Sequence, residues 1–152
     1  MKKILSFIIF LSLIVSVAYA DGLSDFIENW NKIAYIYDTP EFSADDFEVD
    51  GNYFKITGDD WEIGLIISGD TVTKAALTAT DGDTFLKMCT TLGTTVVRKK
   101  TSDDLFKYRA NVLDMYLSTL SGKEPREAAF GYDYAYMLKA QKGKYSYLIM
   151  KQ

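Results

Sequence analysis

The spacing of apolar residues along the chain changes from helical to extended within the first third. Apolar side chains recur at steps of three and four over residues 24–37, which predicts an amphipathic helix that Pro40 closes. From Phe47 the period becomes two, and turn signals follow at short intervals. Four strands are therefore expected, at about residues 46–49, 53–57, 61–68 and 71–79. In the third of them, the apolar set expected to face the core is Trp61, Ile63, Leu65 and Ile67.

Helical spacing returns over residues 84–97, and Asp81-Gly82-Asp83 stands where that helix needs an N-cap. The cap-like Ser102-Asp103-Asp104 introduces another helix, which Ser121-Gly122 ends. Its expected inward stripe is Leu105, Arg109, Val112, Leu113, Tyr116 and Leu120. The remaining chain alternates again, and Lys142-Gly143 is placed to form a two-residue hairpin turn.

The predicted order is therefore helix, four strands, two helices and two strands, with connections short enough for antiparallel neighbours. This order predicts an α+β fold: a single antiparallel sheet of about six strands with helices packed on one face. The helix-then-meander order suggests a degenerate internal duplication, but no convincing residue repeat relates the halves. Without a linker or a low-complexity segment, residues 21–152 are expected to form one domain.

The first twenty residues have the layout of a cleavable secretory signal peptide. Two lysines precede an apolar stretch over residues 4–17, and small residues follow at Ala18 and Ala20. The alternative is an uncleaved membrane anchor, but the stretch is short for a span of roughly 20 residues. Cleavage would leave Asp21 as the N-terminus of a chain without a transmembrane segment. The expected location is the periplasm or the outside of a bacterial cell.

The only cysteine is Cys89, so the exported chain has no intrachain disulfide to stabilise it and depends on its core. Cys89 shares a helical face with Phe85, Met88 and Leu92, which predicts a buried thiol that fills space.

Charge is distributed unevenly between the two halves of the chain. Residues 21–83 contain 15 acidic and 3 basic residues, whereas residues 84–152 contain 6 acidic and 12 basic ones. Such polarity would steer a charged partner or promote head-to-tail self-association. The alternative is that the two halves interleave in the fold and mix their charges.

Tyrosines are concentrated near the C-terminus. If Gln141 pairs with Lys144 across the hairpin, the tyrosines share one side of it, while Met137, Leu148 and Met150 share the other. Methionine and leucine suit packing under helices, whereas tyrosine can keep its hydroxyl in water. The candidate binding face is Tyr132, Tyr134, Tyr136, Tyr145 and Tyr147. The alternative is that tyrosine is used here simply as a favoured strand residue.

The sequence lacks the residues that several kinds of catalytic and binding site require. Histidine is absent, which removes Ser-His and Cys-His nucleophiles and the commonest metal ligand, and no nucleotide-binding glycine pattern occurs. Asp46 to Gly51 imitates the start of a calcium loop, but its twelfth position is Thr57 rather than glutamate, so a strand and turn are preferred. No cofactor and no metal site are expected. Nucleic acid is an unsuitable partner because the chain is acidic.

The sequence resembles no family that we recognise, and the functional hypothesis follows from composition. It is a non-enzymatic exported module that binds a protein or a glycan, with an unknown oligomeric state. One alternative is a small hydrolase or lyase that uses carboxylates such as Asp59, Asp60 and Glu62 with a tyrosine. Another is an envelope protein that self-associates through its opposite charges.

Overall fold

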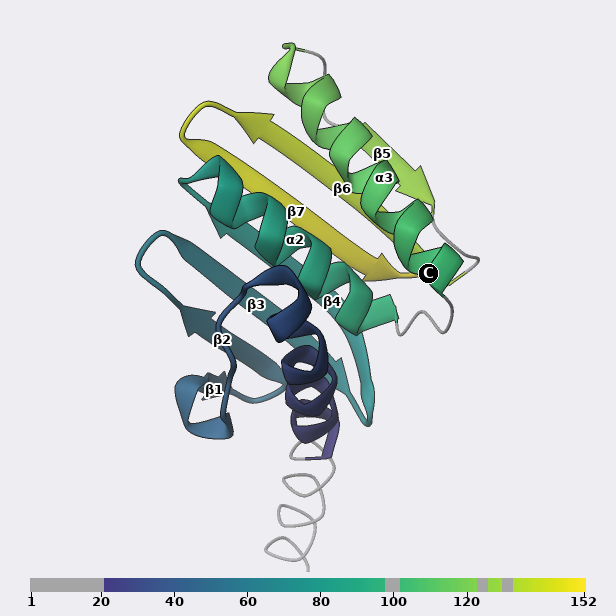
Figure 1. The fold of residues 1–152 in the computed structure, drawn as a ribbon. Helices are drawn as coiled ribbons and strands as arrows, with labels where there is room; N and C mark the ends of the chain where they lie inside the picture. The colour runs from purple at the N-terminus through teal and green to yellow at the C-terminus, as the bar shows by residue number, and fades with distance from the viewer. Residues whose placement is uncertain (1–20, 98–101, 123–125, 130–132) are drawn as a thin grey trace, which may run out of the picture.

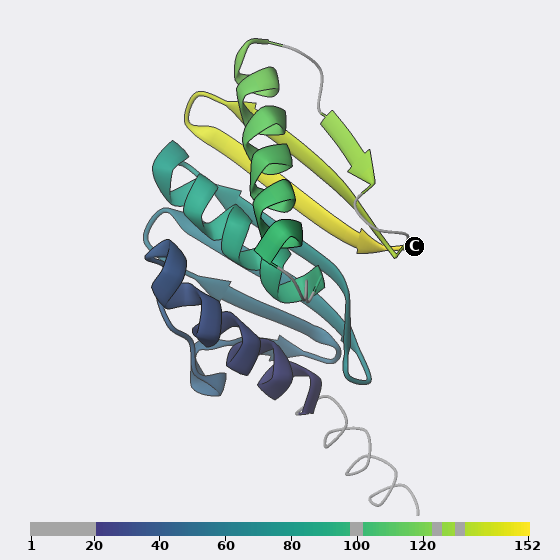
Figure 2. The same cartoon turned by 45° about the vertical axis from the view of Figure 1, so that its right-hand side comes forward.

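The computed structural model of the chain describes residues 21–97, 102–122, 126–129 and 133–152. In this part of the chain, seven strands form one antiparallel sheet, and helices lie on one of its faces (Figure 1 and Figure 2). The predicted α+β class, with helices on one face of a single antiparallel sheet, is confirmed. The predicted signal peptide lies outside the described residues, so its cleavage stays a prediction.

The strands follow the chain as two meanders that meet in the middle of the sheet. The first comprises β1 (Glu48–Asp50), β2 (Tyr53–Thr57), β3 (Trp61–Ser68) and β4 (Thr71–Ala79). The second comprises β5 (Arg126–Ala129), β6 (Tyr134–Gln141) and β7 (Lys144–Lys151), and the order across the sheet is β1-β2-β3-β4-β7-β6-β5. The short edge strand β5 was not predicted. The hairpin register was predicted correctly, because Gln141 pairs with Lys144 and Gly143 takes the positive φ of 74° that its turn requires.

The helices begin and end close to the predicted positions. The N-terminal helix includes residues 21–37, a short 3-10 helix η1 covers Ala44–Asp46, α2 covers Gly82–Val97, and α3 covers Ser102–Leu120. The backbone N–H of Thr84 donates to Asp81 Oδ1 at 2.8 Å, which confirms the predicted cap of α2. This hydrogen bond lowers the pKa of the Asp81 carboxyl. None of the helices in the described ranges combines the length and the apolar character that crossing a membrane requires.

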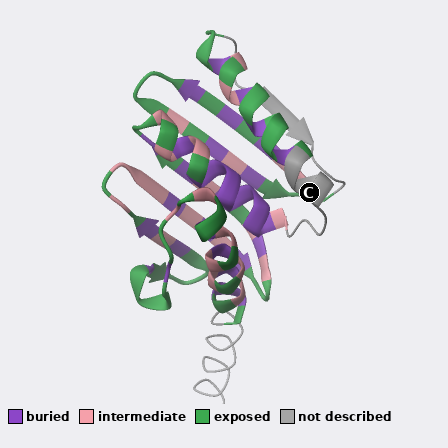
Figure 3. Cartoon of the chain, in the orientation of Figure 1, coloured by how far each residue is buried: buried purple, intermediate pink, exposed green. Residues whose placement is uncertain are grey.

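The buried side chains lie between the sheet and the helix layer (Figure 3). Helix α2 lies between the other two helices and contributes Phe85, Met88, Cys89 and Leu92 to the core, as its spacing predicts. Cys89 is fully buried, which raises the pKa of its thiol and agrees with a space-filling role. The N-terminal helix buries its predicted stripe through Leu23, Phe26, Trp30 and Ala34.

The predicted inward stripe of α3 is partly wrong. The structure buries Tyr108, Val112, Met115 and Thr119, whereas Leu113 and Leu120 are exposed. The helix is rotated from the predicted orientation because the Tyr108 ring packs against Gly93 of α2, where a Cβ would collide with it. The hydroxyl of Thr119 also faces inward and accepts a hydrogen bond from the Ala140 backbone N–H at 3.1 Å. The spacing of apolar residues along α3 predicts neither contact, because both contacts involve residues of other elements.

The sheet order keeps the two halves of the chain apart. The acidic half contributes β1 to β4 on one side, and the basic half contributes β7 to β5 on the other. Within the sheet, the predicted alternative that the halves interleave is therefore wrong, although α2 of the basic half packs over β4 and its Lys87 pairs with Asp38 of the acidic half at 2.7 Å. The molecule keeps the charge polarity of its sequence across the width of the sheet.

Candidate functional site

The tyrosines of the predicted binding face point toward the helices. Tyr136 is 3% exposed and Tyr147 is 1% exposed, and their rings stack with centroids 6.1 Å apart. The two hydroxyls of Tyr147 and Tyr108 hydrogen-bond to each other across the interface of β7 and α3. Because this bond satisfies the Tyr147 hydroxyl inside the protein, the hydroxyl does not need water. The prediction of a water-exposed face is wrong for Tyr136 and Tyr147.

The other members of the predicted face lie at its margins. Tyr134 is half-buried, and its hydroxyl donates to the backbone carbonyl of Val72 at 3.5 Å. Tyr145 is also half-buried, and its ring stacks on Phe85 of α2 with centroids 5.4 Å apart. Tyr132 lies outside the described residues. Tyr145 also lines a cavity between the two meanders.

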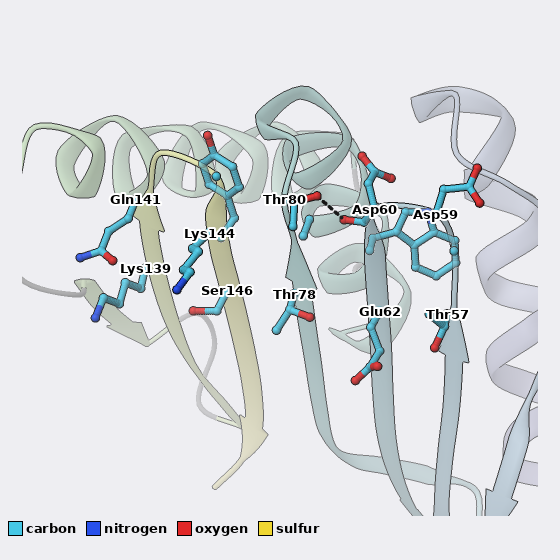
Figure 4. A pocket seen from close by; sticks show the side chains of 15 residues that line it. Thr57, Asp59, Asp60, Glu62, Thr78, Thr80, Lys139, Gln141, Lys144 and Ser146 are labelled. Carbon is cyan, nitrogen blue, oxygen red and sulfur yellow. Dashed lines mark hydrogen bonds between the residues drawn. The ribbon is translucent and has the colours of Figure 1, made fainter.

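This cavity, which we call the end groove, lies at one end of the sheet and has a volume of about 550 Å³. Three segments that are distant in sequence form it: the β2–β3 turn, the end of β4 and the β6–β7 hairpin (Figure 4). Thr78, Ala79 and Thr80 of β4 lie between the other two segments. A cavity of this size falls within the range that holds small ligands or a few residues of a peptide.

The two sides of the end groove carry opposite charges. Asp59, Asp60 and Glu62 come from the acidic half, on the β2–β3 side. Lys139 and Lys144 come from the basic half, on the β6–β7 side. Among the described residues, no ion pair joins the two sides, since Glu62 pairs instead with Lys55 at 3.3 Å. That pairing raises the pKa of the Lys55 ammonium. The charges across the groove are thus available to a ligand.

Aromatic side chains add apolar surface to the groove. Trp61 and Tyr145 lie on either side of Ala79 in the strand register, and both are half-buried. The Trp61 indole covers Gly58, where a Cβ would collide with it. It also packs near the Phe42 ring, with the two ring centroids 5.7 Å apart. These contacts hold the ring in place and leave part of it accessible, so the groove offers a rigid aromatic contact at little entropic cost.

The acidic side chains of the groove do not converge. In Figure 4 the carboxylates of Asp59, Asp60 and Glu62 point in different directions. Catalysis by two carboxyls requires both to approach one bond of the substrate. Nor do the described residues contain a group of three or more potential metal ligands. Glu48 to Asp50 form β1, as the strand-and-turn interpretation of the calcium-like segment predicts, whereas Asp46 lies in η1 and not in the predicted strand.

Sequence reasoning did not find this groove. Its residues come from two turns and one strand end, separated by up to about 90 positions, and no local motif joins them. The one signal in the sequence was the charge difference between the halves, which becomes the difference between the two sides of the groove. Comparisons with family models, with curated proteins and with solved structures found no match. A functional argument therefore rests on the geometry of the site.

Proposed function

We propose that this protein is an exported, non-enzymatic binding module whose end groove holds a short polypeptide segment that carries both charges. A basic group of the segment would lie beside Asp59 and Asp60, and an acidic group would lie beside Lys144. The observation that carries this proposal is the pair of oppositely charged, unbridged sides across a groove with a neutral floor. A ligand with both charges gains attraction at both sides, whereas a ligand with one charge is repelled at one of them.

The apolar contact with Trp61 and Tyr145 supports the same proposal. A peptide that enters the groove covers the accessible parts of both rings, and such aromatic contacts contribute much of the affinity at binding sites. The same rings also suit a sugar, so a neutral glycan is the second candidate ligand. A glycan gains nothing from the charge difference, and this property separates the two candidates.

The experiment uses chain 21–152 and synthetic tetrapeptides with lysine at one end and glutamate at the other. Binding is followed by the shift of the Trp61 indole N–H signal in NMR spectra, with an uncharged tetrapeptide and a neutral oligosaccharide as comparison ligands. We expect Lys144→Glu, which cancels the net positive charge of the β6–β7 side, to weaken peptide binding at least about tenfold, equivalent to about 1.4 kcal/mol.

The matched control is Lys142→Glu, which changes charge equally on the same hairpin but does not line the groove. It should retain wild-type affinity. Equal weakening by both variants would mean that net charge, and not the groove, governs binding. Binding of the oligosaccharide alone, unaffected by Lys144→Glu, would replace the peptide by a glycan.

A further inference from the structure

The face of the sheet opposite the helices is uncovered among the described residues, and we call it the open face. Its side chains form three rows across the strands, as the strand register shows. A polar row beside the end groove contains Thr57, Glu62, Thr78, Ser146 and Lys139. A middle row contains Lys55, Gly64, Ala76, Leu148 and Met137, and an outer row contains Tyr53, Ile66, Lys74, Met150 and Ala135.

The middle and outer rows expose large apolar side chains to water. Tyr53, Met137 and Met150 are 39%, 36% and 40% exposed, and Ile66 and Leu148 are partly exposed beside them. A contiguous apolar patch over several strands is uncommon on a protein that stays monomeric, and usually marks an interaction surface.

We infer that the open face binds the open face of a second copy of this chain, around a two-fold axis that runs close to the strand direction between β4 and β7. This inference goes beyond the proposed function, because it concerns a different partner and a surface that shares only its polar row and Lys144 with the end groove. The axis follows from the distribution of charge. On β1 to β3 the open face carries Glu48, Asp50 and Glu62 with one lysine, Lys55, whereas on β6 and β7 it carries Lys139 and Lys144.

A two-fold rotation about the strand direction places each acidic side over the basic side of the second copy. Glu62 then faces Lys139 of the second copy, and the same pair forms again on the other side of the axis. A rotation about the direction across the strands would instead place acid over acid and lysine over lysine, which is repulsive. The charge polarity of the chain thus makes the open face complementary to itself in one of the two arrangements.

The sizes of the side chains support the same axis. Within the middle row, the rotation places Gly64 opposite Met137 and Ala76 opposite Leu148, so that a small residue meets a large one each time. Around Gly64 and Ala76 the face is hollowed by about 220 Å³, and Tyr53, Ile66 and Lys74 line the hollow. The Tyr53 ring already covers Gly64, so Met137 of the second copy would lie against that ring, a favourable sulfur–aromatic contact, while Leu148 of the second copy would enter the hollow beside Ala76.

The flat area of the open face lies near the lower limit for a specific dimer. Five strands spaced by about 4.8 Å and eight residues long cover about 24 Å by 26 Å, on the order of 600 Å² before the relief of the side chains is counted. Stable interfaces bury about 800 Å² on each partner. Two sheets stacked in this way form an aligned sandwich, with strand directions within about 30° of each other.

The first test is the mass of chain 21–152 by sedimentation equilibrium over a range of concentrations. We expect a dimer that Leu148→Lys converts to a monomer, because the substitution buries a charge opposite Ala76. The control is Leu117→Lys on α3, a more exposed site away from the sheet, which should remain dimeric. Circular dichroism and urea unfolding verify that both variants fold. A wild-type chain that stays monomeric at all concentrations would overturn the inference.

The second test examines the axis through the pairing of Glu62 with Lys139. Lys139→Glu should weaken dimerisation at least about tenfold, and the exchange Glu62→Lys with Lys139→Glu should restore it. Lys142→Glu, with the same change in charge on the hairpin turn, should have little effect. A dimer that is lost with Leu148→Lys but indifferent to Lys139→Glu would contradict the proposed axis.

The first test is distinguishable from a failure of peptide binding, because it measures mass and because Leu148 does not line the end groove.

Discussion

The two faces of the sheet are both apolar, yet they differ in the size of their side chains and in what covers them. On the covered face, β6 and β7 present Tyr136, Leu138, Tyr147 and Ile149 to the helices. On the open face, the same strands present Met137, Leu148 and Met150 to water, next to Gly64 and Ala76. The rings lie where a helix layer can fill the space around them, and Tyr108 of that layer hydrogen-bonds to the Tyr147 hydroxyl. The open face keeps apolar side chains over a hollow that nothing in the described chain fills.

This difference shows that the polarity of a residue type is a weak guide to which face is buried. A tyrosine hydroxyl tolerates burial when a partner reaches it, and Tyr108 of α3 supplies that partner for Tyr147. Three predictions test the difference between the faces, in addition to the two experiments proposed above.

The largest effect is expected from Tyr147→Ala. Removing a fully buried ring leaves a cavity and deprives the Tyr108 hydroxyl of its hydrogen-bond partner, so the free energy of unfolding should fall by about 3–5 kcal/mol. Urea unfolding followed by the fluorescence of the buried Trp30 measures the loss. The control is the neighbour Leu148→Ala on the open face, which should cost less than about 1.5 kcal/mol when measured at concentrations that keep the chain monomeric. Similar losses for the two variants would mean that the faces are not distinguished as described.

A smaller effect is expected from removing one hydroxyl of the buried tyrosine pair. Tyr108→Phe or Tyr147→Phe should each lower the free energy of unfolding by about 1–3 kcal/mol, because the remaining hydroxyl loses its partner inside the core. The double variant should be less destabilised than the sum of the two, since it leaves no unpaired hydroxyl. Strict additivity in this double-mutant cycle would show that the two hydroxyls do not interact.

The smallest effect under ordinary conditions is a dependence on alkaline pH. Burial raises the pKa of the Tyr108 and Tyr147 hydroxyls well above the usual value, which is about 10. Above about pH 10 the unfolded chain therefore binds fewer protons at these positions than the folded one, and stability falls as pH rises. The contribution is complete below that pH and is lost as the pH approaches the folded pKa. Urea midpoints measured between about pH 8 and 11 should decline at the upper end, and less so in the double phenylalanine variant.

Much of the fold was accessible from local patterns. The N-terminal helix, β2 to β4, the cap at Asp81 and the register of the β6–β7 hairpin each depend on spacing or turn chemistry within a few residues. The orientation of α3 was not accessible, because it depends on how Tyr108 packs on Gly93. Strand β5 was missed because its four residues form too short a pattern to recognise.

The candidate site was less accessible than the fold. The four tyrosines that the structure describes were correctly grouped on one side of the hairpin, but the choice of which side meets the helices was wrong. Tyr145 reaches the end groove because its strand ends beside β4, and Trp61 and the acids of the β2–β3 turn meet it only through the order of the strands. No sequence pattern within one segment predicts that these residues lie together.

The amino-acid sequence by itself determined the elements, the alternation of two faces along each strand and the unequal charge of the two halves. These are local or additive properties, set by the spacing of side chains and by their formal charges. The tertiary structure alone decided which face of the sheet the helices cover, and that the acidic and basic halves stay on opposite sides of the end groove. The physical reason is that burial and electrostatic complementarity depend on partners distant in sequence, such as Tyr108 for Tyr147, and those partners exist only once the chain has folded.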